Sequence, residues 1–548
     1  MRKYTLIILL LMGFGFAQAQ IAPNYYAIQF TDKDNNPFTL DQPQDFLTQR
    51  SIDRRTAQNI AYDITDLPIT PSYIQQVADI GVEIQNRVKW LNCLVIKTSD
   101  QNLLDEINAL DFVADITKMT DGRNHPNVTK KTFFEVEEQI VQKERETISQ
   151  HKSTSSFNYG QALDQIEFIN GVSLHDAGFA GQGMVIAVLD AGFYGVPERK
   201  VFDSLYANNQ ILGAVDFASE NNNPFEGSTH GTAVLSTMGA NWPGQMVGTA
   251  PKASYWLIRT EFADYEYIIE EYNWVTGAAF ADSVGADIIN SSLGYSEFDD
   301  PSMDHTWDDL DGNTAVVTIG ADLAAKKGIL PVNSAGNSGS SAWYYISCPA
   351  DGDSVLAIGA TDYYGNLAGF SSRGRPLDPR VKPNVCAVGE GTVVADAYYD
   401  GISTSSGTSF SSPTIAGMTA CLWQANPSFN NKQIMEAIEM SASQASNPDN
   451  DFGYGIPDYD LANSIVKVDN LAHSAHDISI YPNPVSELLY VEKLSPNTHL
   501  SIFDISGRMI YENHNSTKAI NVQDWPSGVY LIQAKTAEKT INQKFLKK

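Results

Sequence analysis

Three segments in the middle of the chain carry side chains that together could perform acyl transfer. Asp190 follows the apolar run Val185–Leu189, His230 lies among small residues, and Ser409 lies in a run of glycine, threonine and serine. A serine hydroxyl becomes a useful nucleophile when an imidazole accepts its proton and a carboxylate orients that imidazole. Each residue alone also has a structural interpretation, as a turn former, a packed ring and a helix cap respectively. Their combination favours a nucleophilic site.

The surroundings of Ser409 predict the start of a helix. Residues Thr414–Ala425 are small and apolar and are typical of a buried helix. The unpaired N–H groups and the dipole at a helix N-terminus favour negative charge that develops beside Ser409. Pro413 is compatible with this helix if it lies in the first turn.

The elements that must position these side chains predict an α/β fold. From about residue 159 to residue 468, short β-branched runs alternate with helical segments, as in 185–189, 286–290 and 355–359. Apolar runs separated by helices are typical of a mostly parallel sheet that helices flank on both faces. Asp190 would then lie at the carboxyl end of a parallel strand, where such sheets place ligands.

The order Asp, His, Ser and several further motifs resemble the subtilase family. The matching landmarks between and after the three residues are Gly248-Thr249-Ala250-Pro251, Ile289–Gly294, Val332–Asn337, Phe370-Ser371-Ser372 and Gly453-Tyr454-Gly455. The resemblance implies a subtilisin-like catalytic domain over residues 151–468. It also implies a serine endopeptidase that hydrolyses peptide bonds through an acyl-enzyme.

The resemblance assigns roles to individual residues. Asp190, His230 and Ser409 would form the catalytic triad, and the Asn337 amide would hold the oxyanion with the Ser409 backbone N–H. The substrate-binding residues would be Ser292, Leu293, Gly294, Ser334, Ala335 and Gly336. Two departures from the family pattern are Ala191 after the aspartate and Phe410-Ser411-Ser412 after the serine, and neither removes a proton-transfer group.

The chemistry implied by the resemblance requires no cofactor, although subtilases often bind structural calcium. Acidic clusters such as Asp449-Asn450-Asp451 offer the oxygen ligands that calcium prefers. Asn241-Trp242-Pro243-Gly244, however, looks unlike the usual calcium loop of the family. The sequence therefore leaves the metal ligands unassigned.

The N-terminus predicts export and a removable domain. Arg2 and Lys3 precede the apolar run Tyr4–Phe16 and the small residues at 17–19, so residues 1–19 are interpreted as a signal peptide. The alternative, a membrane anchor, needs about 20 apolar residues. The resemblance to subtilases implies that residues 20–150 are an α/β propeptide plus a charged linker, which would assist folding and block the cleft.

Four elements are expected in that N-terminal region: strands at 25–30, 88–96 and 112–116 and a helix at 101–110. A charged helix is expected near 134–148, followed by a polar joint at 151–156. The alternative to a propeptide is an independent binding domain.

After a linker at 469–477, the C-terminal residues 478–548 predict a small β-sandwich, because short strands alternate with turns. The motifs at 480–484, 503–508, 527–532 and 544–548 resemble the sorting domain of the type IX secretion system, with Ser506 where asparagine is more usual. The resemblance implies that this secretion machinery is a partner and that the protein crosses the outer membrane or stays on it. The alternative is a carbohydrate-binding or adhesive sandwich.

Composition excludes several other classes. With 36 basic and 65 acidic residues, the formal net charge is −29, which argues against binding nucleic acid or anionic membranes. Four cysteines cannot build a disulfide scaffold, and a bridge between Cys348 and Cys386 is left open.

Residues 295–312 contain seven acidic residues and no lysine or arginine, which indicates either a solvated loop or a preference for basic substrates.

These observations together favour a secreted, monomeric serine endopeptidase of broad specificity that acts on proteins or peptides and is inhibited by its own propeptide. A catalytically silent subtilase that binds at a surface is the second hypothesis. A processing protease of narrow specificity is the third, and the acidic segment favours it slightly.

Overall fold

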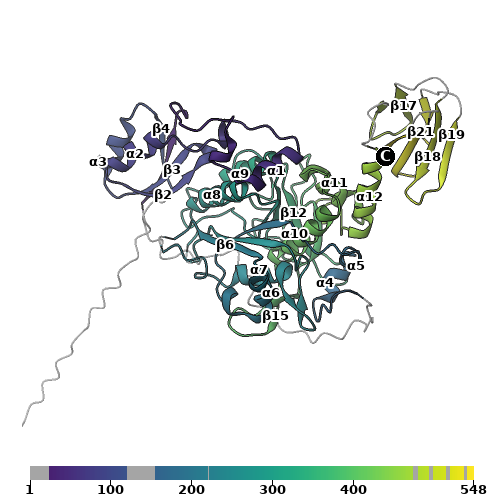
Figure 1. The fold of residues 1–548 in the computed structure, drawn as a ribbon, viewed down its shortest axis with the longest axis horizontal. Coiled ribbons are helices and arrows are strands. Elements are labelled where there is room, and N and C mark those ends of the chain that lie inside the picture. The colour runs from purple at the N-terminus through teal and green to yellow at the C-terminus, as the bar shows by residue number, and fades with distance from the viewer. Residues whose placement is uncertain are drawn as a thin grey trace, which may run out of the picture.

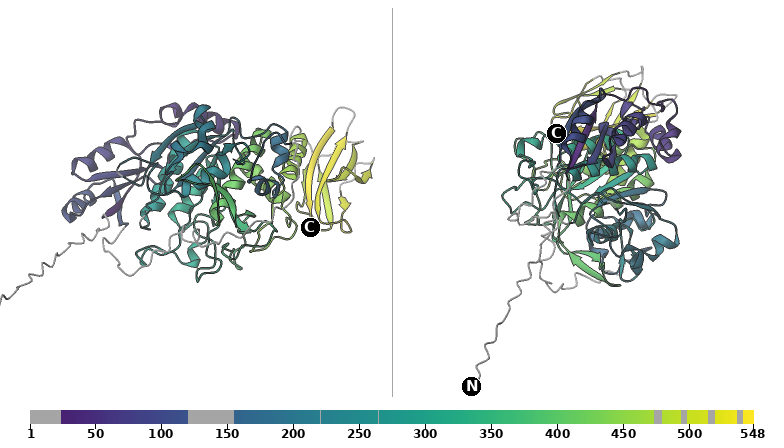
Figure 2. Two further views of the ribbon diagram at one scale, coloured as in Figure 1. Left: turned by 90° about the horizontal axis from the view of Figure 1, so that it is seen from below. Right: turned by 90° about the vertical axis from the view of Figure 1, so that its left-hand side faces the viewer.

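The computed structural model describes residues 24–119, 155–219, 221–263, 265–472, 479–492, 498–513, 519–535 and 540–548. The predicted signal peptide, the charged helix near 134–148 and most of the polar joint lie outside these ranges. Within them, three units follow one another along the chain (Figure 1). The central unit, teal to green, lies between the purple N-terminal unit and the yellow C-terminal unit (Figure 2).

The central unit is built on a seven-stranded parallel sheet in the order β13-β12-β11-β10-β5-β9-β6. The strands are β5 (Val185–Asp190), β6 (Ile211–Asp216), β9 (Ser254–Arg259), β10 (Ile288–Ser291), β11 (Leu330–Ser334), β12 (Leu356–Thr361) and β13 (Val385–Val388). The predicted mostly parallel sheet is confirmed. Strand β5, which ends at Asp190, lies inside the sheet between β10 and β9.

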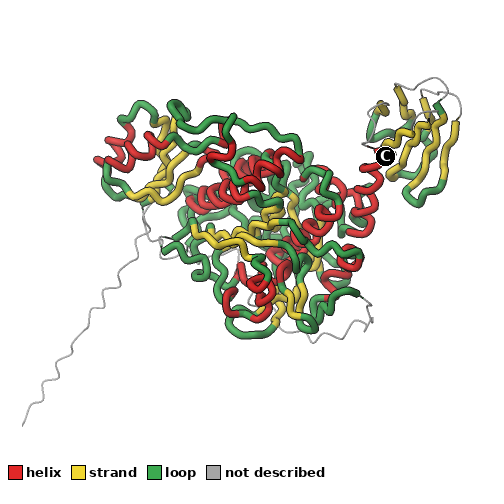
Figure 3. Tube along the Cα trace, viewed as in Figure 1, coloured by secondary structure: helices red, strands yellow, loops and turns green. Residues whose placement is uncertain are grey.

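Helices cover both faces of this sheet, because its inner strands are apolar on both sides. In β5, Ile186 and Val188 face one hydrophobic core, whereas Val185, Ala187 and Leu189 face the other. The first core includes side chains of α7 (His230–Gly239) and α10 (Thr408–Ala425), and the second includes those of α8 (Ile269–Val284) and α9 (Val316–Lys326). Figure 3 shows strands between helices on two sides.

Shorter elements complete the central unit. Its other helices are α4 (Leu163–Glu167), α5 (Val172–Asp176), α6 (Asp203–Ala207), α11 (Asn431–Ser441) and α12 (Tyr459–Ala472), and two small hairpins pair β7 (Asn241–Trp242) with β8 (Met246–Val247) and β14 (Thr392–Ala395) with β15 (Ile402–Ser405). Helix α12 continues through residues 469–472, so the first part of the expected linker is helical.

The N-terminal unit contains a four-stranded antiparallel sheet in the order β2-β3-β1-β4. Its elements are β1 (Tyr25–Phe30), α1 (Gln49–Ala57), α2 (Pro71–Asp79), β2 (Glu83–Val88), β3 (Cys93–Lys97), α3 (Gln101–Asn108) and β4 (Val113–Lys118). The single strand expected at 88–96 is wrong. A 3-10 turn at Lys89–Leu91 and a left-handed Asn92, with φ of 53°, reverse the chain, so that Val88 pairs with Cys93.

The C-terminal unit is strand-rich, as predicted. One sheet has the order β16-β17-β20 and the other the order β19-β18-β21-β22. The strands are β16 (Ser479–Tyr481), β17 (Leu488–Glu492), β18 (His499–Asp504), β19 (Met509–Asn513), β20 (Ala519–Asn521), β21 (Gly528–Lys535) and β22 (Thr540–Lys547). Buried side chains of both sheets, such as Leu489 and Ile532, share one core.

Two further findings concern membrane spans and cysteines. No helix among the described residues is long and apolar enough to cross a lipid bilayer. The four cysteines are buried and free, so the structure does not bridge Cys348 to Cys386.

Candidate active site

The carboxylate of Asp190 and the imidazole of His230 meet at the carboxyl end of the sheet. Asp190 is the last residue of β5, and His230 is the first residue of α7. His230 Nδ1 lies 2.8 Å from Asp190 Oδ1 and 3.0 Å from Asp190 Oδ2, and both side chains are buried. The backbone N–H of Ala191 also donates to Asp190 Oδ1, at 2.8 Å. The carboxylate therefore orients the imidazole through Nδ1, and Nε2 points away from Asp190.

Two glycines allow α7 to approach β5 closely enough for this contact. Gly231 donates its N–H to the carbonyl oxygen of Gly192 at 3.1 Å, and a Cβ atom at Gly231 would lie 2.5 Å from that same oxygen. Gly192 has φ of 147°, and a Cβ there would lie 2.1 Å from the carbonyl oxygen of Glu226. The small residues around His230 in the sequence are explained by this close backbone contact.

Ser409 lies in the first turn of α10, but the helix starts earlier than expected. It begins at Thr408, so Pro413 is its sixth residue and not part of the first turn. Because proline has no N–H, the carbonyl of Ser409 loses its helical donor. The hydroxyl of Ser292 donates to that carbonyl instead, at 2.9 Å, and the Ser409 hydroxyl donates to the Ser292 carbonyl at 3.5 Å.

A ring contact connects this turn to His230. The ring of Phe410, the residue after Ser409, lies 5.9 Å from the imidazole, measured between ring centroids. Phe410 is fully buried. The departure from the family pattern at this position therefore places an aromatic ring against the predicted catalytic base, and the imidazole lies beside the first turn of α10.

Asn337, three residues after the end of β11, is held by the same turn. Its Oδ1 accepts hydrogen bonds from the backbone N–H of Thr408 at 2.9 Å and from the Thr408 hydroxyl at 3.0 Å. The backbone N–H of Gly336 donates to that hydroxyl at 3.2 Å. These bonds identify Oδ1 as the acceptor of the Asn337 amide and Nδ2 as its donor. Sequence reasoning missed Thr408, although it stands directly before Ser409.

The six predicted substrate-binding residues lie at the ends of the neighbouring strands β10 and β11. Ser292, Leu293 and Gly294 follow β10, whereas Ser334 ends β11 and Ala335 and Gly336 follow it. The carbonyl of Leu293 accepts hydrogen bonds from Asn333 Nδ2 at 2.9 Å and from Ser334 Oγ at 3.4 Å. The two segments are therefore held against each other at the edge that carries Asp190 and Asn337.

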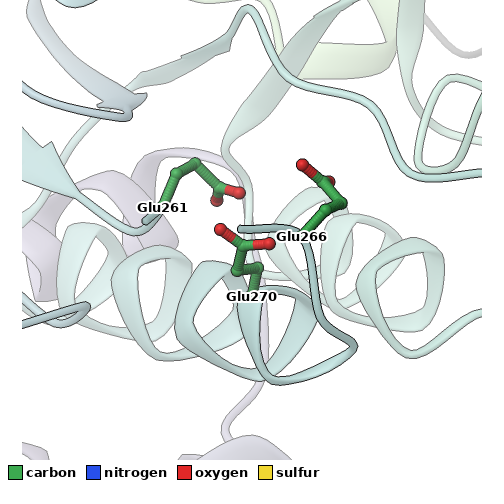
Figure 4. Close-up of side chains that lie close together, drawn as sticks. All are labelled: Glu261, Glu266 and Glu270. Carbon is green, nitrogen blue, oxygen red and sulfur yellow. The ribbon is translucent and has the colours of Figure 1, made fainter. Parts of the chain in front are cut away.

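An acidic cluster that the sequence did not indicate follows β9, with Glu261 and Glu270 buried and Glu266 partly exposed. The carboxylate oxygens of Glu261, Glu266 and Glu270 lie within 4.8 Å of one another (Figure 4). Tyr295 donates its hydroxyl to Glu261 at 2.6 Å, and Glu270 accepts two backbone N–H groups. Burial raises the pKa of Glu261 to about 7, and the charge of Asp190 adds to the rise.

Among the described residues, these three glutamates are the acidic group whose oxygens lie close enough to share one cation. The carboxylates of the cluster at 449–451 make bonds within the chain. Asp449 accepts two backbone N–H groups of its own turn, and Asp451 pairs with Arg373 at 2.9 Å. Residues 241–244 form part of the β7–β8 hairpin.

The acidic segment at 295–312 uses several of its carboxylates to build its own loop. Asp304 accepts the backbone N–H of Phe298 at 2.6 Å, and Asp309 caps a turn at Thr306. Asp308 pairs with Arg375 at 3.1 Å while its side chain remains 96% exposed. These bonds give the carboxylates a structural role.

Comparisons with known proteins agree with this geometry. The profile of the subtilase family matches residues 181–455, which span the sheet, Asp190, His230 and Ser409. The Peptidase S8 propeptide domain of Bacteroidota matches residues 25–132, and a secretion system C-terminal sorting domain matches residues 479–548.

The chain is also similar to curated subtilisins over its central unit. It is 30% identical to Subtilisin E of Bacillus subtilis over 312 residues, which cover 56% of this chain and 70% of that protein. It is 30% identical to Subtilisin of Bacillus pumilus over 285 residues, with 51% and 90% covered. These matches identify the chain as a serine-type endopeptidase. The chain belongs to the subtilase family.

The flanking matches identify the other two units. Residues 25–119 belong to a propeptide domain, so the enzyme is made as a zymogen. The strand-rich C-terminal unit is a sorting domain of the type IX secretion system, which directs the protein to the outer membrane or the exterior.

Proposed function

We propose that this secreted endopeptidase hydrolyses peptide bonds of broad sequence range through a triad of Asp190, His230 and Ser409. The observation that carries the proposal is the buried contact between Asp190 and His230 Nδ1, beside the helical turn that contains Ser409. A carboxylate in this position orients the imidazole so that Nε2 can accept a proton.

In the proposed mechanism, Ser409 Oγ attacks the carbonyl carbon of the scissile bond while His230 Nε2 takes its proton. Asp190 stabilises the imidazolium that forms. The Asn337 amide and the Ser409 backbone N–H donate to the oxyanion of the tetrahedral intermediate. The C–N bond then breaks, His230 returns the proton to the leaving amine, and an acyl-enzyme remains. A water molecule attacks the acyl-enzyme in the same way and releases the acid.

The substrate would bind in an extended conformation between the two segments at the ends of β10 and β11. Ser292–Gly294 and Ser334–Gly336 would pair with its backbone as neighbouring strands and would form the walls of the first pocket. No step needs a cofactor. A structural calcium ion stays an expectation from the family resemblance and takes no part in these steps.

The proposal divides the chain into a signal peptide at 1–19, a propeptide with its linker at 20–150, a catalytic domain at 151–468, a linker at 469–477 and a sorting domain at 478–548. The propeptide would inhibit the enzyme until it is removed. The enzyme would act as a monomer after export by the type IX machinery.

Digestion of an unfolded, casein-like protein tests this function. We expect the matured enzyme to cut it at many sites and the matched Ser409→Ala variant to cut it at none. Mass spectrometry of the products gives the cleavage sites. Cleavage at one or two sites only, with basic residues near the cut, would favour the processing protease and a role for the acidic segment. Intact substrate in both samples would favour the silent binding protein.

A further inference from the structure

An open pocket of about 380 Å³ lies at the surface of the central unit, and none of its residues has a task in the proposed mechanism. It is lined by Thr306, Trp307, Asp308 and Trp343, and we call it the tryptophan pocket. Trp307 is 48% exposed, although tryptophan is usually well covered in folded proteins. The Asp308 side chain is 96% exposed. An aromatic ring and a carboxylate are therefore both accessible from the solvent at this site.

One wall of the tryptophan pocket continues from the predicted substrate-binding segment Ser292–Gly294. The chain leaves this segment and returns at His305, whose backbone N–H donates to the carbonyl of Ser296 at 2.9 Å. The His305 side chain pairs with Glu271 of α8, which fixes the point of return. Trp307, two residues later, is therefore held close to the end of that segment.

The other wall, which holds Trp343, continues from the second predicted substrate-binding segment. The backbone N–H of Ser347 donates to the carbonyl of Ala335, in the middle of that segment, at 3.2 Å. Tyr295 and Cys348 exchange two backbone hydrogen bonds, at 2.8 and 3.1 Å, and so join the two walls. The tryptophan pocket is thus built on extensions of both sides of the proposed substrate channel, outside the first pocket.

Contacts with neighbouring residues hold the indole rings in place. Trp343 Nε1 donates to the carbonyl of Ile346 at 2.9 Å. The ring of Trp307 lies 5.3 Å from that of Tyr345, measured between ring centroids, at an interplanar angle of 87°. An indole has a single N–H donor, so Trp343 offers a ligand its ring and no hydrogen bond.

The segment that carries Trp307 and Asp308 is acidic. Residues 295–312 contain seven acidic residues and no lysine or arginine. Asp308 pairs with Arg375 at 3.1 Å, but Arg375 is not a lining residue of the pocket. An ion pair of so exposed a carboxylate is weak, so an incoming cation can compete for it.

These features fit a positively charged side chain. A cation over the face of an aromatic ring is attracted by the ring quadrupole, and tryptophan gives the strongest contact of this kind. The Asp308 carboxylate would add a charge-assisted hydrogen bond. Lysine and arginine also have apolar stems that can lie along the rings. A neutral side chain would gain the apolar contact alone, and an acidic one would be repelled.

We propose that the tryptophan pocket binds the charged side chain of a lysine or arginine of the peptide substrate, at a position outside the first pocket. The pocket raises kcat/KM for substrates that carry such a residue at the matching distance from the scissile bond. It does not restrict the residue before the cut, so the enzyme still cuts at many sites, at different rates. This inference rests on the proposed function, because it places the substrate between the segments 292–294 and 334–336.

Binding is tested without catalysis on the full chain with Ser409→Ala, the form to which the exposures above apply. The protein is labelled with fluorotryptophan, and the fluorine NMR signals are assigned with Trp307→Phe and Trp343→Phe. The probes are N-acetyl-arginine amide and N-acetyl-citrulline amide, which has a similar shape and no charge. We expect both signals to shift with the arginine probe and the affinity for the citrulline probe to be at least about tenfold lower. Equal affinities would overturn the proposal.

The effect on catalysis is tested with the matured enzyme. Peptides carry arginine, lysine, citrulline or norleucine at one position at a time, and the residue before the cut is kept constant. We expect one position at which a charged side chain raises kcat/KM about tenfold over its neutral counterpart. Trp307→Leu and Asp308→Asn should each lower this ratio below about threefold. The absence of such a position, or a ratio that both variants leave unchanged, would overturn the proposal.

Asp353→Asn is the matched control. Asp353 pairs with Arg380 at 3.0 Å and its side chain is 61% exposed, but it does not line the tryptophan pocket. We expect this variant to keep the ratio within about twofold of that of the unchanged enzyme. A loss as large as that of Asp308→Asn would show that general surface charge is responsible and would overturn the proposal. An inactive enzyme would refute the proposed function and would leave the result of the binding test standing.

Discussion

Replacement of His230 by alanine is expected to lower kcat by about 10⁶-fold with little change in KM. The size of this effect is taken from subtilisin, in which loss of the catalytic histidine alone lowers kcat by about 2 × 10⁶-fold. The reason is that no other group in the proposed site can take the proton from Ser409 as the serine attacks. Substrate binding should persist, because the residues at the ends of β10 and β11 are unchanged.

The measurement is steady-state hydrolysis of a chromogenic peptide by the matured variant. Residual activity of roughly 10³–10⁴ over water is expected from the oxyanion donors and substrate binding. The contact of Gly231 with Gly192 involves backbone atoms only, so the variant should keep the junction of α7 and β5. A loss of less than about 100-fold in a folded variant would mean that another group acts as the base.

A large effect is also expected for Asp190→Asn, which should lower kcat by about 10⁴-fold, as the equivalent change does in a serine protease of another fold. Both oxygens of Asp190 lie within 3.0 Å of His230 Nδ1. An amide carries no charge to stabilise the imidazolium and can favour the wrong tautomer of the ring. The imidazole would then hold a proton on Nε2 and could not accept one from Ser409.

Glu261→Gln is the matched control for this variant. Glu261 is a second buried carboxyl group whose pKa responds to the charge of Asp190, yet it makes its hydrogen bonds to Tyr295 and Thr260. We expect its replacement to change kcat by less than about tenfold. Both variants are measured with the same peptide substrate. Equal losses of kcat would show that catalysis depends on negative charge near the site and not on orientation of the imidazole by Asp190.

The sequence predicted the fold of the catalytic domain because its signals are local. The apolar run that ends at Asp190 predicts a buried parallel strand, and the small residues around His230 predict a close backbone contact. The motif around Ser409 likewise predicts a helix start, and only the position of Pro413 in that helix was wrong. This error has a physical cause, because the hydroxyl of Ser292, from a different strand, replaces the helical donor that proline lacks.

Other features have no recognisable local pattern in the sequence and could not be predicted. Glu261, Glu266 and Glu270 form a cluster only because a loop and the start of α8 bring them together. The left-handed turn at Asn92 interrupts a run whose composition is that of one continuous strand.

Helix α1 is the clearest case of such a limit. Arg50, Arg54 and Arg55 have the pattern of an ordinary solvated helix face, and nothing local marks Arg54 and Arg55 as buried. Their partners, Asp282 and Asp287, lie more than 220 residues later in the chain. Only the folded structure shows that these charges meet.

Labelling with a fluorophosphonate probe tests the central claim most directly, because the probe reacts with a serine hydroxyl that a neighbouring base has activated. The matured enzyme and its Ser409→Ala variant are treated with the probe, and peptide mapping by mass spectrometry locates the label. We predict that the label is on Ser409 in the matured enzyme and that the variant carries none. An unlabelled enzyme from which the propeptide has been removed, or a label on another serine, would contradict the account.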